Sequence, residues 1–211
     1  MSTLYTNARF WSAGQGIFHD LLVKDSIILA TGENVKEFTA ETTIDLNGAF
    51  VIPAFLDGHA HPIFAGREAA GPKINGINSI EEIKAQVKAF ALANPKIPWI
   101  IGGAYEAAII EGGDFDAKWL DEVVSDRPVV LHAVDHHTIW VNSKALEVAG
   151  ITSATKDPQG GTIARNSDGS AKGTLREPSA MALVLNHAPA NTIESDIAAI
   201  TYACAEYRKV G

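Results

Sequence analysis

The sequence predicts an α/β protein in which a small all-β unit precedes a region of alternating strands and helices. The first 52 residues consist of short apolar runs separated by tight-turn residues. From residue 53 onward, apolar runs alternate with segments whose apolar residues recur at helical spacing. We therefore expect two parts, residues 1–52 and 53–211, with a mostly parallel sheet in the second. An open doubly wound sheet and a (β/α)8 barrel both satisfy this pattern.

Two β-hairpins are expected in the first part. One joins the apolar runs 21–23 and 27–30 through a polar turn. The other joins 43–46 and 49–52 through Asn47-Gly48, a dipeptide that supplies the positive φ values of a type I′ turn. Both hairpins belong to the predicted all-β unit.

The second part carries clear start signals for helices. Ser79 and Glu82 form a capping box, which predicts a helix from residue 80 to about residue 93. Asp116 is positioned to cap a helix over 117–124, and the apolar run 129–134 is typical of a strand buried on both faces. The remaining expected elements are a strand at 99–103, a helix at 143–149, a β-hairpin excursion within 157–175, a helix from Pro178 to about 186 and a last helix from 191 or 192 to about 209.

Composition narrows the class of protein. The formal net charge is −8 and no Lys/Arg cluster is present, so nucleic acid and anionic membranes are poor partners. The single cysteine, Cys204, excludes an intrachain disulfide and a cysteine-based zinc site, and we expect it to be a small packing residue on a helix. No signal peptide or membrane span is apparent, so a cytoplasmic enzyme or binding protein is expected.

Two histidines follow the apolar run 49–56, in Asp57-Gly58-His59-Ala60-His61-Pro62. If a strand over 50–56 continues into this motif, His59 and His61 point to the same face. Two imidazoles that converge at the end of a buried strand indicate half of a metal site. The alternative is a pair of surface histidines in a loop.

Residues 51–62 resemble the first barrel strand of the amidohydrolase superfamily, whose usual form is close to PGFxDxHxHP, with Ala54 where glycine is usual. Segments 7–11, 22–25 and 43–48 resemble its N-terminal β-sandwich. Blocks between residues 120 and 177 are similar to the YtcJ-like branch, amidohydrolase family 3. That branch commonly has Asp-Gly-His where this chain has Asp135-His136-His137, so His136 departs from the pattern and His137 matches it.

The resemblance implies a metal-dependent hydrolase with a TIM-like (β/α)8 barrel, of which this chain would hold about half the strands after a β-sandwich segment. His59 and His61 match metal ligands. Glu177 falls where related enzymes often have a carboxylated lysine, and a glutamate could bridge metals directly. One or two divalent ions are implied, with zinc the leading expectation and iron, manganese and nickel the alternatives. Water activated by the metal would attack a C–N bond of a small amide-like substrate.

Each remaining candidate residue has a structural alternative. Asp135 and His137, at the end of a buried strand, could bind substrate, or Asp135 could close a turn. Trp140 could line the pocket or belong to the core. Glu177 could simply favour a helix N-terminus. Four other histidines are expected to be structural or solvent-facing, namely His132 in its strand, His136 on the solvent side, and His19 and His187 without any supporting pattern.

Members of the resembled branch are about twice as long as this chain or more, and the acid/base aspartate is expected beyond residue 211. We therefore expect an N-terminal fragment, from a truncated reading frame or a split protein, that is inactive alone. The alternatives are a non-catalytic or degenerate homologue with at most weak metal binding, and a metal-sequestering protein. A half-barrel would leave raw edges and one uncovered sheet face, so the missing C-terminal half or self-association is expected to cover it.

Overall fold

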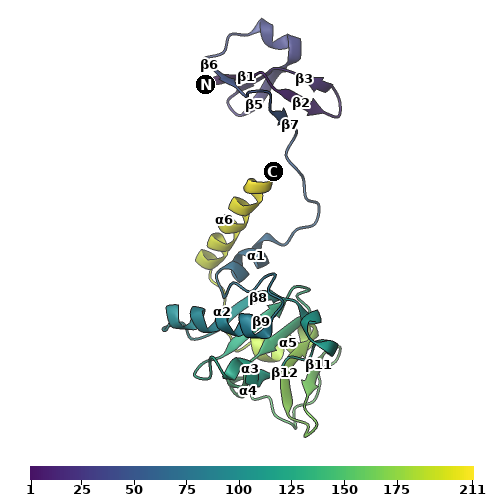
Figure 1. The fold of residues 1–211 in the computed structure, drawn as a ribbon, viewed down its shortest axis with the longest axis vertical. Helices are drawn as coiled ribbons and strands as arrows, with labels where there is room; N and C mark the ends of the chain where they lie inside the picture. The colour runs from purple at the N-terminus through teal and green to yellow at the C-terminus, as the bar shows by residue number, and fades with distance from the viewer. The chain divides into compact units, whose positions relative to one another are not determined.

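The computed structural model describes residues 1–211 and divides into two compact units (Figure 1). The first comprises Met1–His59 with Gly211, and the second comprises Ala60–Val210. The sequence placed the boundary after residue 52. The assignment of the two units to a β-sandwich portion and half of a barrel stays a prediction.

The first unit contains two small sheets, and Leu22, Ala30 and Val35 form a modest core beside the four-stranded one. The expected hairpin over 21–30 is confirmed, because its two strands pair antiparallel and Asp25 and Ser26 have φ values of 49° and 66°. The four-stranded sheet has the order β5-β4-β1-β6, from β1 (Ser2–Thr6), β4 (Leu21–Lys24), β5 (Ile27–Thr31) and β6 (Thr42–Asp45). The three-stranded sheet has the order β3-β2-β7, from β2 (Arg9–Ser12), β3 (Gly16–Phe18) and β7 (Phe50–Val51), and the 3-10 helix η1 spans Gly32–Glu37.

The second expected hairpin is wrong in its pairing. Asn47 and Gly48 do adopt positive φ values, 51° and 76°, so the local turn forms. However, β6 pairs with β1 and β7 pairs with β2, both in parallel, rather than with each other. Asn7 explains the difference, because its carbonyl accepts from the Gly48 amide at 2.6 Å and its side chain donates to Asp45 at 2.7 Å. The turn therefore docks on the β1–β2 connection and directs each strand into a different sheet.

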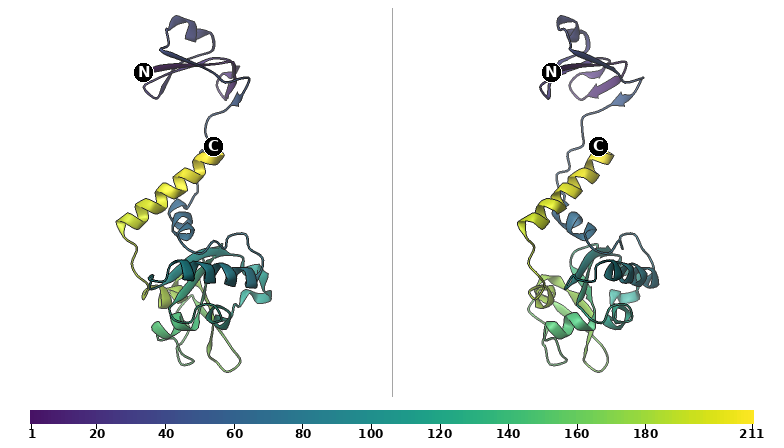
Figure 2. Two further views of the ribbon diagram at one scale, coloured as in Figure 1. Left: turned by 60° about the vertical axis from the view of Figure 1, so that its left-hand side comes forward. Right: turned by 90° about the vertical axis from the view of Figure 1, so that its left-hand side faces the viewer.

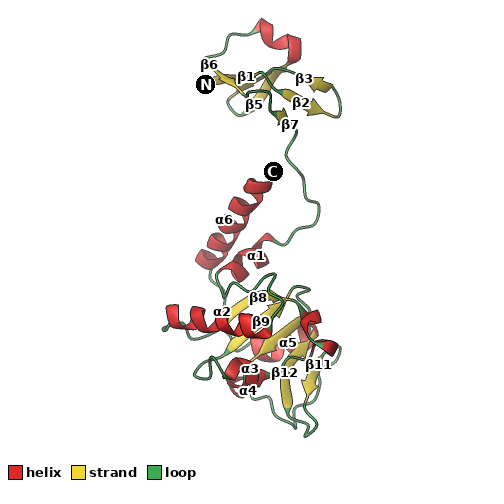
Figure 3. Ribbon diagram, in the orientation of Figure 1, coloured by secondary structure: helices red, strands yellow, loops and turns green.

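The strand that was expected to lead into the histidine motif is shorter than predicted. β7 ends at Val51, and residues 52–61 lie in loop (Figure 3). Pro53 cannot donate to a strand ladder, and Phe55 and Leu56 are 72% and 98% exposed, so no sheet holds this segment. The expectation that a strand aims both histidines at one face is therefore wrong.

The second unit is built on a five-stranded mixed sheet with the order β11-β12-β10-β9-β8. Only β8 and β9 pair in parallel, and the other three pairings are antiparallel. The expectation of a mostly parallel sheet is therefore wrong. Residues 134–137 are too few for a helical crossover, so β10 folds straight back on β9. The strands are β8 (Ile100–Tyr105), β9 (Val129–Ala133), β10 (Thr138–Val141), β11 (Thr162–Arg165) and β12 (Ala171–Arg176). The α/β class is confirmed, and a partial barrel stays a prediction.

Helices cover both faces of this sheet (Figures 1 and 2). Val129 and Leu131 face the core beneath α2 and α3, whereas Val130 faces the core beneath α4 and α5. The expected strand buried on both faces is confirmed, and no uncovered sheet face is present in this unit. The helices are α1 (Pro62–Ala69), α2 (Ile80–Ala93), α3 (Ala117–Asp121), α4 (Ser143–Val148), α5 (Glu177–Leu185) and α6 (Ile193–Val210). None of them combines the length and apolarity that crossing a membrane requires.

Asn142 is a buried polar residue that ties three segments of the second unit together. It is 0% exposed and is the N-cap of α4. Its Oδ1 accepts from the amides of Val129 and Ala145 at 2.9 and 3.0 Å, and its Nδ2 donates to the carbonyls of Val124 and Arg127, both at 2.9 Å. All four hydrogen bonds of the amide group are thus satisfied, as a buried polar side chain requires.

We expect Asn142→Ala to lower the free energy of unfolding by about 3 kcal/mol or more, because it leaves buried backbone donors and acceptors unpaired. Urea denaturation followed by circular dichroism measures this change. The exposed Asn75→Ala provides the control, with an expected change within about 0.5 kcal/mol. A cost for Asn142→Ala as small as that of the control would contradict the assignment.

Candidate active site

The carboxyl ends of β8, β9 and β12 meet at one edge of the five-stranded sheet. Tyr105 lies beside Ala133 at the parallel pair, and Arg176 at the end of β12 lies opposite Thr138 at the start of β10. Two 3-10 helices, η2 (Ala107–Ile109) and η3 (Glu111–Gly113), follow β8 at this edge. A hollow of about 430 Å³ opens there, lined by Ala107, Ala108, Ile110, Gly112, Gly113, Asp135, His137, Thr138, Arg176 and Glu177.

His137 and Glu177, forty residues apart in sequence, form the central pair of this hollow. The ring Nδ1 of His137 lies 3.0 Å from the Glu177 Oε2, and the Glu177 amide donates to the His137 carbonyl at 2.7 Å. Glu177 has a φ of 70°, a left-handed conformation that a glutamate adopts at an energetic cost. The two bonds to His137 hold Glu177 in that conformation and fix its carboxylate over the hollow.

Asp135 and Arg176 shape the rim of the hollow. The Asp135 Oδ1 accepts from the His137 amide at 2.9 Å, which is the turn-closing arrangement. The Arg176 Nη2 donates to the Gly112 carbonyl at 2.8 Å and to the Asp114 Oδ1 at 2.6 Å. The roles of Arg176 and Asp114 were missed from the sequence, although the position of Arg176 beside Glu177 at a strand end was a usable signal.

The electrostatics of the hollow favour a charged His137. The Glu177 carboxylate, which accepts a hydrogen bond from the ring, raises the pKa of His137, and the negative charge of Asp135 adds to this effect. A histidine whose pKa is raised on folding stabilises the fold fully below its ordinary pKa of about 6.5. That contribution is lost as the pH rises through the raised pKa.

A second cluster surrounds His136, which was expected to face solvent. Its ring lies 5.3 Å from the Phe64 ring and 6.4 Å from the His132 ring, centroid to centroid, and its Nδ1 lies 3.5 Å from the Glu68 Oε1. The ring is therefore half-buried, which corrects the expectation. Burial raises the pKa of Glu68 and lowers the pKa of His132 to about 4. Neither Glu68 nor this environment of His136 was found from the sequence.

The predicted metal ligands His59 and His61 lie in the loop that precedes α1. His61 is the N-cap residue of α1, with its ring 5.7 Å from that of Phe64, and the His59 amide donates to Asp57 at 2.9 Å. No group of three or more His, Cys, Asp or Glu side chains lies close enough to hold a metal ion. The donor types, two imidazoles and a carboxylate, suit zinc.

Trp140 lies apart from the hollow. It is fully buried, its Nε1 donates to the Asp116 carbonyl at 3.0 Å, and its ring packs against those of Tyr105, Phe115 and Trp119. Trp140 is therefore a core residue, and it does not line the hollow.

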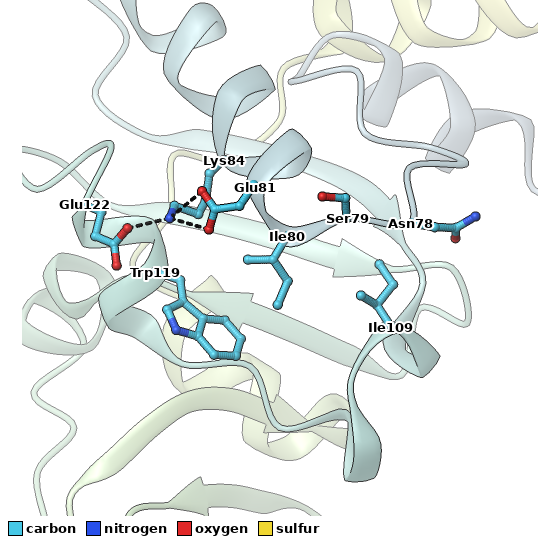
Figure 4. A pocket seen from close by; sticks show the side chains of 8 residues that line it. All are labelled: Asn78, Ser79, Ile80, Glu81, Lys84, Ile109, Trp119 and Glu122. Carbon is cyan, nitrogen blue, oxygen red and sulfur yellow. Dashed lines mark hydrogen bonds and ion pairs between the residues drawn. The ribbon is translucent and has the colours of Figure 1, made fainter.

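A second hollow, of about 540 Å³, lies between α2 and α3 (Figure 4). The Lys84 side chain is 9% exposed, and its ammonium binds the Glu81 carboxylate at 2.8 and 3.0 Å and also the Glu122 carboxylate. The single cation of this hollow is therefore neutralised by two carboxylates that join the helices. Since this arrangement leaves no reactive group, the edge that bears His137 and Glu177 is the candidate active site.

Comparison with solved structures identifies the fold. Over its full length the chain is similar to two solved structures titled uncharacterized metal-dependent hydrolases. For the Pyrococcus furiosus protein the TM-score is 0.66, with 21% identity and 43% of that chain covered. For the Pyrococcus horikoshii OT3 protein the TM-score is 0.68, with 22% identity and 41% of that chain covered. The fold is therefore that of a part of these proteins, less than half of each chain.

The amidohydrolase family profile matches residues 42–211. The chain belongs to the amidohydrolase family. It is 36% identical to YtcJ of Bacillus subtilis (strain 168), which carries an amidohydrolase name, over 79% of this chain and 32% of that protein. It is 32% identical to the exoenzymes regulatory protein AepA of Pectobacterium carotovorum subsp. carotovorum, over 92% of this chain and 44% of that protein. It is 29% identical to the N-substituted formamide deformylase of Arthrobacter pascens, over 65% of this chain and 26% of that protein. The chain thus spans less than half the length of these relatives.

We expect Glu177→Gln to lower the pKa of His137 toward its ordinary value, because the substitution removes the negative charge beside the ring. An NMR titration of the ring protons measures this shift. Asp114→Asn is the matched control, since that carboxylate pairs with Arg176 and its loss leaves the His137–Glu177 pair intact. A His137 pKa that does not respond to Glu177→Gln would show that the pair is absent in solution.

We expect the free energy of unfolding to fall by up to about 3 kcal/mol between pH 6.5 and pH 4 because of His132. The unfolded chain binds a proton at His132 near pH 6.5, whereas the buried ring binds it only near pH 4. Stability from this group is therefore present above pH 6.5 and lost as the pH falls. His132→Gln removes this slope in urea denaturation across the pH range, and His187→Gln, at an exposed site, retains it.

Proposed function

We propose that the intact protein is a metal-dependent hydrolase of carbon–nitrogen bonds in small amide-like molecules. The family match across residues 42–211 carries this proposal. The name of the Arthrobacter pascens relative, an N-substituted formamide deformylase, supports the bond type. The family and the metal-dependent hydrolase neighbours imply a divalent metal, and the histidine and carboxylate donors favour zinc.

We assign His59, His61 and Glu177 as part of the metal-ligand set. The remaining ligands and the acid/base aspartate would come from polypeptide outside these 211 residues. The coverage of the relatives, between 26% and 44% of their length, supports this division. The lack of any three-donor group within the chain fits the same division.

The hollow at the sheet edge is the proposed place for the amide group of the substrate. A protonated His137 has a second N–H, at Nε2, that can donate to a substrate oxygen while Nδ1 is held by Glu177. Arg176, anchored to the loop after β8, keeps the far wall of the hollow in place. Asp135 orients His137 through its backbone rather than by touching the substrate.

A second candidate function is that of a non-catalytic chain with weak metal affinity. The observation that favours it is the exposed, loop-borne position of the His59 motif, which lacks a supporting strand. The two functions share their ligands and differ in turnover, so metal binding and hydrolysis must be measured separately.

We expect zinc, added as the sole metal, to bind weakly to the 211-residue chain. The variants His59→Asn and His61→Asn are each expected to lower the zinc affinity tenfold or more. Equilibrium dialysis with metal analysis measures the affinity, and His187→Asn is the control that retains it. We expect no hydrolysis of N-substituted formamides or simple amides by this chain. Unchanged zinc affinity in both variants would remove the ligand assignment. Turnover by the zinc-loaded chain that His59→Asn abolishes would show a complete site.

A further inference from the structure

One side of α6 packs on α1 (Figure 2). Ala199 and Ala203 are buried there, and a Cβ added to Gly66 of α1 would lie 2.0 Å from the Ala199 carbonyl oxygen. Arg67 adds an ion pair, with its Nη2 2.7 Å from the Asp196 Oδ1. The two helices therefore meet at a tight contact between small residues.

A different side of α6 presents an apolar stripe to solvent. Its residues recur at intervals of four, three, four and three along 18 helical residues, which is the heptad spacing of a coiled-coil seam. Ile193, Ile197, Ile200 and Tyr207 are 75%, 62%, 38% and 45% exposed, and Cys204 is exposed as well. Cys204 thus lies on an apolar face as expected, but it is exposed, so the expectation that it is a small packing residue is wrong. Below, "the α6 stripe" means these five residues, Ile193, Ile197, Ile200, Cys204 and Tyr207.

The charges beside the α6 stripe indicate how it would pair. Glu194 lies near the start of the helix and Arg208 near its end, on the same flank of the stripe. If two copies pair antiparallel about Ile200, Glu194 of each lies beside Arg208 of the other. The antiparallel arrangement also sets the two helix dipoles in opposition. A parallel arrangement would instead bring each end of the helix beside the identical end of its partner.

We propose that two copies of this chain associate through an antiparallel pairing of their α6 stripes. Ile200 packs on Ile200 at the centre, Ile197 on Cys204, and Ile193 on Tyr207. The stripe covers about 20 Å of helix, so the buried area is at the low end of specific interfaces and the dimer depends on concentration. This inference does not rest on the proposed hydrolase activity.

Sedimentation velocity of the full chain over a wide concentration range tests the association. The expected result is a reversible monomer–dimer equilibrium that Ile197→Glu and Ile200→Glu each shift to monomer by tenfold or more. Leu92→Glu, at a 73% exposed apolar site on α2, is the matched control that leaves the equilibrium unchanged. Circular dichroism checks that each variant is folded. A folded wild-type chain that stays monomeric over the whole concentration range would overturn the proposal. The α6 stripe would then be a surface on which another part of a longer polypeptide packs.

Charge reversal and crosslinking test the orientation. R208E weakens the dimer, and the double reversal E194R/R208E restores it, because the pair is re-formed with opposite signs. Under mild oxidation, Ile200→Cys in a Cys204→Ala background forms a covalent dimer, whereas Cys204 of the wild type does not. A dimer that Ile197→Glu leaves intact, or a double reversal without recovery, would overturn the pairing. Efficient crosslinking through Cys204 would show a parallel arrangement and would also overturn it.

Discussion

The tight turn between β9 and β10 is the constraint on which the second unit depends. Asp135 accepts from the His137 amide, and His136 takes a φ of 57°, so the chain reverses within a few residues. Because β10 then runs back along β9, its partner β12 must end at the edge where β9 ends. The pairing of His137 with Glu177 is a direct consequence of this geometry, not an independent feature.

The same turn explains why the sheet is mixed. A parallel successor to β9 would need a crossover of a dozen or more residues, as α3 provides between β8 and β9. The antiparallel return places Trp140 and Ile139 on opposite faces, in the two separate cores. Asn142, at the end of β10, then satisfies backbone groups of the adjoining segments. One short connection therefore determines the strand order, the division of the core and the position of the hollow.

Features that depend on neighbouring residues could be predicted from the sequence. Ser79 accepts from the Glu82 amide, as the capping box predicts, and Asp116 caps α3. Features that depend on distant partners could not. Asn47-Gly48 fixes a turn, but Asn7, forty residues earlier, decides which strands pair. Likewise, the histidine spacing in Asp57–Pro62 cannot show whether a sheet supports it, and none does. Glu177 was found by resemblance, but its bond to His137 depends on strand register, which the sequence does not specify.

His136 links the candidate site to α1. A left-handed conformation costs a residue with a Cβ about 1 kcal/mol, and the resembled branch commonly has glycine at this position. In this chain the histidine ring offsets that cost by contacts with Phe64, His132 and Glu68. Phe64 in turn contacts His61, the N-cap of α1. A continuous series of contacts therefore runs from His61 through Phe64 and the turn to Glu177. Because His136 stands where glycine is usual, its ring adds contacts between the segments that carry His61 and Glu177. These two predicted ligands lie more than a hundred residues apart in sequence.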